Sequence, residues 1–393
     1  MAPLDIAIAG CGPAGLAAAL LLHRDGHRVS LYERFEAPRP IGSGLMLQPT
    51  GLAVLAKLGL ADALLAHGAR IARLTGEADG RTILDVHYSA LEGERFGLGI
   101  HRATLFAILH DAVLAAGIPI HTGSEIAGSV REGAQRRLRL PQGDSAPVDL
   151  IVDALGARSP LAGNGGRALA YGALWASLPW QDGFDESALQ QRYRRASVMV
   201  GVLPTGRQPG SETRQAAFFW SLRADRLEDW RARGLASWKA EVEALWPATR
   251  PLLDAIVDPD QLTFARYAHR TLAAPAEPGL IHIGDAWHST SPQLGQGANM
   301  ALLDAWALAQ ALRQSGTIVE ALAQTVALRR RHVRLYQAMS RWLTPVYQSD
   351  GRLVPLLRDR LIGPISKLPP VMRLQAAMVS GLVGRPLHPL GLG

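Results

Sequence analysis

The sequence lacks the features that mark secreted or membrane-spanning proteins. Its 393 residues include one cysteine, Cys11, so an internal disulfide is impossible and a reducing compartment is expected. The apolar stretch Ala14–Leu22 is too short to cross a membrane, and Asp5 is the only charged side chain before it, so it does not predict a signal peptide. With 48% hydrophobic residues the chain can bury a large core, and a cytoplasmic protein of two intertwined domains is expected.

The net charge of +7 is unevenly distributed along the chain. Between Arg329 and Gly393 there are ten Arg and one Lys against two Asp, so the whole basic excess lies in this tail, among apolar residues such as Leu353 and Leu356. Such a segment fits peripheral contact with anionic lipid at the inner face of a membrane, or contact with a cofactor phosphate. Solvated outer faces of C-terminal helices account for it equally well. No recognised nucleic-acid-binding module accompanies the charge, so nucleic acid is not an expected partner.

A glycine-rich turn near the N terminus joins a strand-like segment to a helix-like one. The turn consists of Gly10, Cys11, Gly12, Pro13, Ala14 and Gly15. Gly10 permits the turn, Gly12 lets the backbone approach a pyrophosphate, and Gly15 lets the helix pack on the strand. A second strand, Arg28–Tyr32, leads to Glu33, where a carboxylate accepts from adenosine ribose hydroxyls. The pattern predicts a Rossmann-like dinucleotide site in which Cys11 is a small filler.

A second motif lies about 270 residues further along the chain. The strand-like segment Leu280–Ile283 leads to Asp285, and a glycine-rich entry then opens a helix expected from Met300 to Arg313. The entry consists of Pro292, Gln293, Leu294, Gly295, Gln296, Gly297, Ala298 and Asn299. Asp285 can accept from a ribityl hydroxyl, and the N–H groups at the helix start can hold the flavin pyrimidine oxygens. An NAD-dependent Rossmann dehydrogenase would explain the first motif but not the second, so together the motifs predict one bound FAD.

On these motifs, and on Arg102 at the start of a helix-like segment, the chain resembles the single-component (class A) flavoprotein aromatic hydroxylases. Para-hydroxybenzoate hydroxylase and the ubiquinone-biosynthesis hydroxylases are familiar members, and the resemblance covers most of the chain. It implies FAD contacts by Arg102, Asp285, Pro292, Gly295, Gln296, Gly297, Ala298 and Asn299. It also implies that NAD(P)H reduces the flavin, that O₂ forms a flavin C4a-hydroperoxide, and that one oxygen passes to an aromatic or quinone-like substrate. Arg34, beside Glu33, is interpreted either as a flank of the adenine or as a solvated surface arginine.

One motif of this sequence differs from the family pattern. Leu155 stands where the family carries an aspartate that is linked to FAD and NAD(P)H pyrophosphate binding, whereas Gly156, Arg158 and Ser159 match. The departure implies normal retention of FAD but slow reduction by NAD(P)H. Reduction by a separate flavin reductase, or a non-oxygenating flavin oxidoreductase, therefore remains an alternative. The other interpretation is that Asp153 takes over the role of the missing aspartate.

The alternation of elements predicts an α/β chain (α+β overall) with a Rossmann-like FAD-binding domain, an inserted, mostly antiparallel substrate sheet and C-terminal helices. The FAD-binding domain is assigned to residues 1–70, 100–165 and 275–345, the substrate domain to 71–99 and 166–274, and a basic helical segment to 346–393. The strand-like segments of the substrate domain are Arg81–His87, Leu169–Leu178, Ser197–Leu203, Gln215–Leu222 and Leu262–Tyr267. Two helical segments, Asp225–Gly234 and Ala236–Trp246, are expected to cover this sheet.

Aromatic residues at alternate positions mark candidate walls of a substrate pocket. Phe218 and Trp220 share one strand face, and Trp175 shares a face with Tyr171, so Trp175, Phe218 and Trp220 are the pocket candidates, with core packing as the alternative. These strands carry no Lys or Arg to pair with a buried carboxylate, which favours a neutral, apolar aromatic or quinone-like substrate over a hydroxybenzoate. No catalytic base is identified. No metal-ligand cluster is evident, and the histidines beside the second motif are interpreted as structural.

Overall fold

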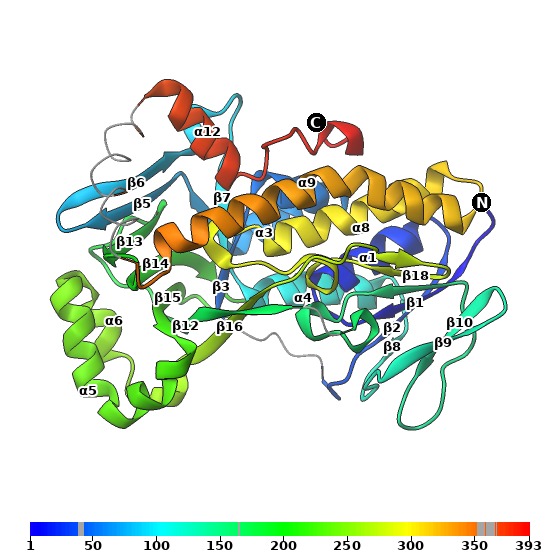
Figure 1. Cartoon of the computed structure of the whole chain (residues 1–393), viewed down its shortest axis with the longest axis horizontal. Helices are drawn as coiled ribbons and strands as arrows, with labels where there is room; N and C mark the ends of the chain where they lie inside the picture. The colour runs from blue at the N-terminus through cyan, green and yellow to red at the C-terminus, as the bar shows by residue number, and fades with distance from the viewer. Residues whose placement is uncertain (38–42, 164–165, 352–357, 359–365, 367) are drawn as a thin grey trace.

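The computed structural model describes residues 1–37, 43–163, 166–351, 358, 366 and 368–393 (Figure 1). Within these residues, one half of the molecule is built on a six-stranded sheet with the order β17-β18-β11-β1-β2-β8, which we call the parallel sheet. We call this half, which contains the predicted dinucleotide motif, the nucleotide-type half. Only β17 runs antiparallel to its neighbour. The strands are β1 (Asp5–Ala9), β2 (Arg28–Tyr32), β8 (Ile120–His121), β11 (Leu150–Asp153), β17 (Ala276–Glu277) and β18 (Leu280–His282). The apolar residues of β1 and β11 are almost wholly buried because helices and loops cover both faces of the sheet.

The second half is built on a seven-stranded sheet with the order β16-β12-β15-β14-β13-β5-β6, which we call the large sheet. All of its neighbouring pairs are antiparallel except β13 with β5. Its strands are β5 (Arg73–Ala78), β6 (Arg81–His87), β12 (Arg167–Pro179), β13 (Ala188–Arg194), β14 (Val198–Arg207), β15 (Arg214–Arg223) and β16 (Thr263–His269). The predicted fold class is confirmed. The assignment of residue ranges to domains stays a prediction.

One face of the large sheet is covered by α5 (Leu227–Leu245) and α6 (Arg250–Asp254), as Figure 1 shows at the lower left. Gly234, with φ +75°, interrupts α5 at the boundary between the two predicted helical segments. Three tryptophans of this cover, Trp230, Trp238 and Trp246, are buried against the sheet. We call this covered face the outer face.

The opposite, inner face of the large sheet packs on a small sheet that leads back to the nucleotide-type half. The small sheet has the order β3-β7-β4, with α2 and α3 following β3. Their bounds are β3 (Gly44–Leu47), β4 (Ala69–Ile71), β7 (Gly97–His101), α2 (Pro49–Lys57) and α3 (Ala61–His67). A Cβ on Gly99 would lie 2.0 Å from the Pro204 carbonyl oxygen, and one on Gly44 would lie 2.4 Å from Thr205 Cγ2. Glycine at both positions therefore lets the small sheet lie directly on β14.

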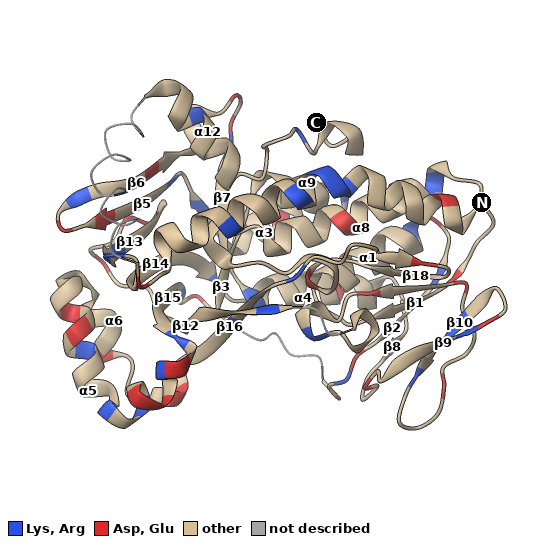
Figure 2. Ribbon diagram, in the orientation of Figure 1, with Lys and Arg blue, Asp and Glu red and all other residues tan. Residues whose placement is uncertain are grey.

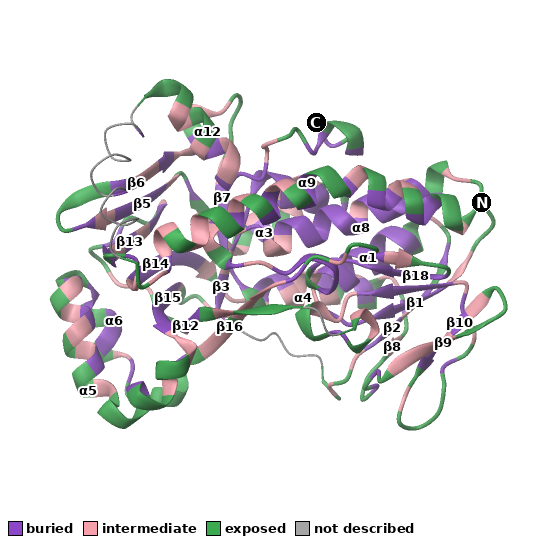
Figure 3. Cartoon of the chain, in the orientation of Figure 1, coloured by how far each residue is buried: buried purple, intermediate pink, exposed green. Residues whose placement is uncertain are grey.

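Helices α8 (Gly297–Gln314) and α9 (Ile318–Tyr347) run side by side across the molecule (Figure 1). Figure 3 shows α8 almost entirely buried and α9 with an exposed stripe, so α8 is the central helix of the nucleotide-type half. Helix α1 (Pro13–Arg24) packs between α8 and α4 (Arg102–Ala115), and α12 (Pro369–Val379) packs on β6. Other elements are the hairpin β9 (Gly128–Glu132) and β10 (Gln135–Arg139), and the short helix α7 (Asp285–His288).

The basic C-terminal tail is only partly a surface feature. Figure 2 marks the arginine positions along the α9 ribbon in blue, yet Arg329 of this helix is buried, as is Arg358. The apolar residues Leu353 and Leu356, on which the predicted lipid contact depends, lie outside the described residues. Within the described ranges, no helix combines the length and apolar character needed to span a membrane.

Candidate functional site

The glycine turn between β1 and α1 has the geometry that its sequence predicts. Gly10 has φ +101°, and a Cβ on it would lie 2.9 Å from the Ala154 carbonyl oxygen. A Cβ on Gly15 would lie 2.0 Å from the Gly10 carbonyl oxygen, so any side chain there would push α1 away from β1. No described heavy atom lies within 4 Å of the position that a Cβ on Gly12 would take. The backbone at Gly12 is therefore open to a ligand.

The helices that follow the two glycine-rich motifs, α1 and α8, both begin without a side-chain cap among the described residues, as α2 and α7 also do. Helix α1 begins at Pro13 after Gly12, and α8 begins at Gly297 after Gln296, with no capping side chain at either. Gly295 adopts the left-handed conformation, φ +61°, and turns the chain into α8. Uncapped N termini offer free N–H groups and a positive dipole end, which are suited to phosphate oxygens and to negative charge on a flavin ring. The two motifs found in the sequence thus supply two backbone sites that fit FAD. We call them cradles: one is the glycine turn with the start of α1, and the other is the start of α8.

The carboxylate of Glu33 lies against the glycine turn. Its Oε2 accepts from Cys11 N (3.0 Å) and its Oε1 accepts from Phe35 N (3.3 Å). Arg34 is exposed, and its guanidinium lies 4.6 Å from the centre of the Phe35 ring. Burial, with a further contribution from Glu33, raises the pKa of the Cys11 thiol to about 12. A thiol in that state is a poor nucleophile, in keeping with a packing role for Cys11.

Asp285 lies at the start of α7, near the N terminus of α8. A Cβ on Gly297 would be 3.9 Å from Asp285 Oδ1, so the carboxylate stands over the first turn of α8. The side chain is exposed to solvent, yet the surrounding protein is dense enough that burial raises the pKa of its carboxyl, against the effects of His288 and Arg102. A side chain that is exposed to solvent although dense protein surrounds it is typical of a residue that lines a hollow. Arg102, at the start of α4, therefore shares an electrostatic environment with Asp285.

Two predicted FAD contacts use their side chains elsewhere. Asn299 is fully buried: its Nδ2 donates to the carbonyl oxygens of Met46 (3.2 Å) and Gly295 (3.0 Å), and its Oδ1 accepts from Gln48 N (2.8 Å). Gln296 Nε2 donates to the carbonyl oxygen of Leu294 (3.3 Å) and to that of a residue in α12. Any contact of Asn299 with FAD must therefore come from the backbone, whereas Gln296 Oε1 has no hydrogen-bond partner among the described residues. Their side chains hold β3 and the C-terminal segment against the start of α8.

A buried ionic network beneath the site was not identified in the sequence. Asp304, in α8, accepts from Gly284 N (2.9 Å) and from Arg329 Nε (2.7 Å), and it contacts His288 Nε2 at 2.6 Å. Burial alone would raise the pKa of the Asp304 carboxyl, but His288 and Arg329 outweigh it and lower the pKa to about 2. The network ties the turn that carries Asp285 to α9. Its only sequence signal is an acid inside the otherwise apolar run of α8.

His332 extends this network to the C-terminal segment. Its two contacts are compatible with only one protonation state of the ring. Its Nε2 lies 3.0 Å from the Gly381 carbonyl oxygen, and its Nδ1 lies 3.0 Å from Arg329 NH1. Because a carbonyl oxygen only accepts and a guanidinium only donates, the ring is neutral, with its proton on Nε2. Burial, reinforced by Arg329, lowers the pKa of His332 to about 3.

His332 is expected to make the protein sensitive to acid. A histidine whose pKa falls on folding contributes full stability above its unfolded pKa of about 6.5 and loses it as pH falls toward about 3. At about 1.4 kcal/mol for each pH unit, the loss over the whole window is about 5 kcal/mol. Urea unfolding between pH 7 and 4 should show a flatter profile for His332→Gln, which keeps one donor and one acceptor. Parallel profiles for the two proteins would contradict this assignment.

Asp153, at the end of β11, orders the turn that contains Leu155. Its Oδ1 accepts from Leu155 N (3.0 Å), and its Oδ2 accepts from Ser159 Oγ (2.6 Å) and contacts His282 Nδ1 at 2.7 Å. Leu155 is half-buried and packs on the apolar cluster around β11. The turn is therefore held by Asp153 without an aspartate at position 155. This arrangement supports the interpretation that Asp153 takes over the structural part of that role.

The inner face of the large sheet carries a small aromatic group. The rings of Trp175 and Phe219 lie 4.7 Å apart, and Trp175 Nε1 donates to the Tyr267 hydroxyl (2.9 Å). Burial raises the pKa of Tyr267 to about 12, although Trp175 and Arg102 oppose the shift. Arg102 lowers the pKa of Tyr267 as well as that of Asp285, so its charge acts on both side chains.

The prediction that Phe218 and Trp220 line a substrate pocket is wrong. Both are buried on the outer face, where each ring packs edge-on against Trp238 of α5 at 6.0 and 6.3 Å. Side chains alternate between the faces of a strand, so Phe219, between them, points to the inner face. Trp175 stays a candidate, and Phe219 and Tyr267 join it.

A polarised chain of hydrogen bonds also lies at the junction of the two halves. Ser43 Oγ donates to the Ala176 carbonyl oxygen (3.0 Å), so its contact with Ser177 Oγ (2.9 Å) has Ser177 as the donor. His101 Nδ1 accepts from Ala103 N (3.1 Å), so its Nε2 carries the proton and donates to Ser177 Oγ (2.8 Å). Ser177 is exposed and keeps one free lone pair, so it can only accept from a ligand. These residues lie far apart in the sequence and gave no local signal.

The chain is similar to known proteins over most of its length. Residues 3–335 match the family model described as FAD binding domain. A putative 2-heptyl-3-hydroxy-4(1H)-quinolone synthase, AqdB1 of Rhodococcus erythropolis, is 27% identical over 89% of this chain and 90% of its own. A 6-methylpretetramide 4-monooxygenase of Streptomyces rimosus is 29% identical over 93% and 89%. HpxO of Klebsiella pneumoniae, solved in complex with FAD and uric acid, is similar in fold with a TM-score of 0.80, at 19% identity over 95% and 97% of the two chains.

The matched model spans both cradles, from the glycine turn through α8. The chain therefore belongs to the FAD binding domain family, and within it to the class A flavoprotein monooxygenases.

Proposed function

We propose that the protein hydroxylates a neutral aromatic, heteroaromatic or quinone-like small molecule with O₂, using FAD that is reduced by NAD(P)H. The observation that carries the proposal is the pair of uncapped N termini, of α1 and α8, with Glu33 beside one and Asp285 beside the other. When bound, FAD supplies the redox chemistry and the activation of O₂. The protein itself binds the cofactor, orients the substrate and shields the reaction from water.

Each cradle has a distinct task in this proposal. The N terminus of α1 binds the pyrophosphate, and Glu33 accepts from the adenosine ribose hydroxyls. Asp285 accepts from a ribityl hydroxyl, and Arg102 contacts the same part of the cofactor. The N–H groups at the start of α8 stabilise negative charge on the reduced ring.

The inner face supports a neutral substrate. Trp175 and Phe219 offer apolar contact, while Tyr267 and Ser177 offer a hydroxyl and a lone pair for orientation. Strands β12, between Tyr171 and Leu178, and β15, between Ala216 and Leu222, carry no Lys or Arg for a substrate carboxylate. One of the relatives is named for the synthesis of an alkyl quinolone, which is in keeping with this class.

Isotope labelling tests the reaction type. A screen of neutral aromatic compounds should identify substrates that accelerate NAD(P)H oxidation, and the product formed under ¹⁸O₂ should contain one labelled oxygen atom. Label that arrives from water instead would contradict the proposal.

A separate flavin reductase is a second candidate for the source of the electrons. The leucine at position 155, in place of the family aspartate, favours it. We expect slow, weakly saturable reduction of the wild-type flavin by NADH or NADPH, since leucine offers no partner for polar groups of the dinucleotide. Leu155→Asp should raise the rate at least about tenfold, a change of about 1.4 kcal/mol in the barrier, as measured by anaerobic stopped-flow absorbance.

Leu155→Asn is the control for this experiment, because it separates hydrogen bonding from charge. Retention of FAD should be nearly the same in all three proteins, since Asp153 already orders the turn. Fast, saturable reduction of the wild type that Leu155→Asp does not improve would show that the departure has no functional effect.

A further inference from the structure

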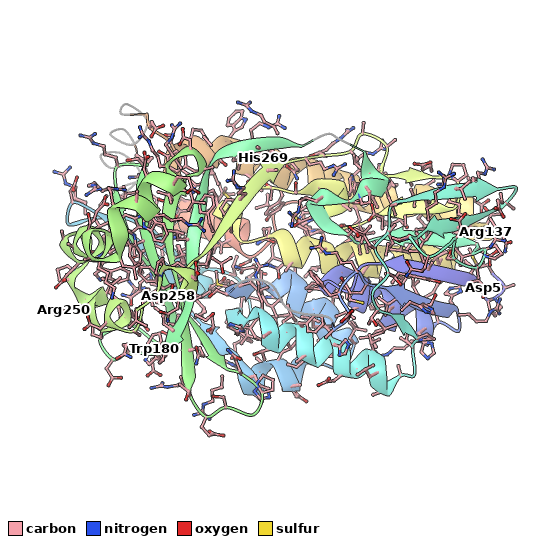
Figure 4. All side chains as sticks on the ribbon, turned by 90° about the horizontal axis from the view of Figure 1, so that it is seen from below. Asp5, Arg137, Trp180, Arg250, Asp258 and His269 are labelled. Atoms are coloured by element: carbon pink, nitrogen blue, oxygen red, sulfur yellow. The ribbon has the colours of Figure 1, made fainter. Side chains whose placement is uncertain are left out.

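A cleft of about 310 Å³ lies at the end of the large sheet, where β14 ends and β15 begins. None of the residues that line it belongs to the glycine turn, to α7 or to the start of α8. Figure 4 labels Trp180, one of its walls, at the opposite end of the molecule from Asp5 and Arg137. Its volume is at the lower end of the range for small-molecule sites, about 300–1,000 Å³. The residues that line the cleft thus differ from those that the proposed function uses.

Backbone contacts give the cleft a defined shape. β14 is irregular between Pro204 and Gly206, and Gly206 has φ +69°. A Cβ on Gly206 would lie 1.9 Å from the His67 carbonyl oxygen, so only glycine lets β14 approach the end of α3 here. Bulges of this kind often redirect the chain beside a binding site.

Cationic side chains dominate the lining. Arg70, Arg207 and Arg214 face the cleft, and Glu186 is the one acidic side chain among the lining residues. Each arginine forms an ion pair with a carboxylate that is more exposed than the arginine itself. For Arg70 with Glu94 the exposed fractions of the side chains are 57% and 83%. They are 48% and 95% for Arg207 with Glu212, and 46% and 60% for Arg214 with Glu186. Exposed pairs of this kind are weak, so a ligand carboxylate that binds two guanidiniums can displace them.

The rest of the lining is flat and apolar. The indole of Trp180 is half-buried and packs edge-on against Phe184, with ring centres 6.1 Å apart. Pro204 and Ala69 add apolar surface. The Arg70 guanidinium lies 4.4 Å from the centre of the Phe96 ring, which orients it at the rim. An aromatic wall beside several guanidiniums matches a flat ring that carries an acid group.

We propose that this cleft binds a small aromatic carboxylate at a site distinct from the flavin site. The carboxylate lies between Arg207 and Arg214, and the ring lies against Trp180. The proposal does not depend on the reaction proposed above, because it concerns different residues and an equilibrium measured without turnover.

Calorimetric titration of the FAD-loaded protein with 2-naphthoate tests the site. We expect saturable binding that weakens as salt is raised, and an affinity that falls at least tenfold in the double variant Arg207→Gln, Arg214→Gln. Trp180→Leu should also weaken binding. Arg139→Gln is the matched control, since Arg139 is exposed on β10, away from the cleft.

Three outcomes would overturn the proposal. One is the absence of saturable binding up to millimolar 2-naphthoate. Another is equal affinity in the wild type and the double variant, which would place the ligand elsewhere, for example on the inner face. The third is equal binding of the neutral analogue 2-naphthylmethanol. Arg207 and Arg214 are exposed, so unchanged melting temperatures should show that the variants fold normally.

Discussion

Replacing Arg329 with methionine is expected to lower the free energy of unfolding by about 3–5 kcal/mol, because it leaves a buried carboxylate without its cation. Arg329 and Asp304 both have side chains with 0% exposure, and their contact is 2.7 Å. Methionine fills part of the volume but offers no donor to Asp304 or to the Nδ1 atom of His332. Urea unfolding at neutral pH, followed by tryptophan fluorescence, measures the change.

The neighbouring Arg330 provides the control for this variant. It is exposed on the same helix, so Arg330→Met should change stability by no more than about 0.5 kcal/mol. Adding Asp304→Asn to Arg329→Met should recover part of the loss, because a neutral amide is less costly to bury than an unpaired carboxylate. Equal stability of Arg329→Met and Arg330→Met would show that the buried pair adds nothing to stability.

Replacing Asp285 with alanine is expected to weaken FAD binding by about 10- to 100-fold. The carboxylate stands over the start of α8 and is exposed within dense protein, where it can accept from a ribityl hydroxyl. A hydrogen bond to a charged group contributes about 1.5–3 kcal/mol, which sets the range. Titration of the apoprotein with FAD, followed by quenching of flavin fluorescence, gives the dissociation constants.

Two further variants sharpen this test. Asp285→Asn keeps an acceptor and should bind FAD with intermediate affinity, whereas Asp62→Ala, on the exposed surface of α3, should bind as the wild type does. If Asp285→Ala retains the wild-type affinity, or if the wild-type protein takes up no FAD, the assignment of the site is wrong.

The parts of the fold that the sequence predicted well are those in which local rules dominate. The strand–turn–helix around Gly10 has its predicted geometry because close backbone contacts require glycine at Gly10 and Gly15, while the backbone at Gly12 stays open. β2 and β6 have the predicted bounds, since apolar alternation and turn residues delimit them. The interruption of α5 at Gly234 follows from a single residue.

The parts that were missed depend on residues distant in sequence. β5 and β13 were not predicted, because neither has a clear apolar alternation, and their parallel pairing joins segments more than 100 residues apart. The same reason applies to the chain of Ser43, Ser177 and His101. Hydrogen bonds between distant segments leave no periodic signal in the sequence.

The sequence by itself determined the family and the fold class, because the motifs that indicate both lie in short segments whose glycines and strand ends act locally. Only the tertiary structure decided which face of the large sheet is covered by α5 and α6. Alternation shows that Trp220 and Phe219 point to opposite faces, but only the packing of α5 on Trp220 shows which face is enclosed. The partners of Asp304 and Asp153 were likewise decided by packing, because a buried charge is paired by whichever element the fold brings beside it.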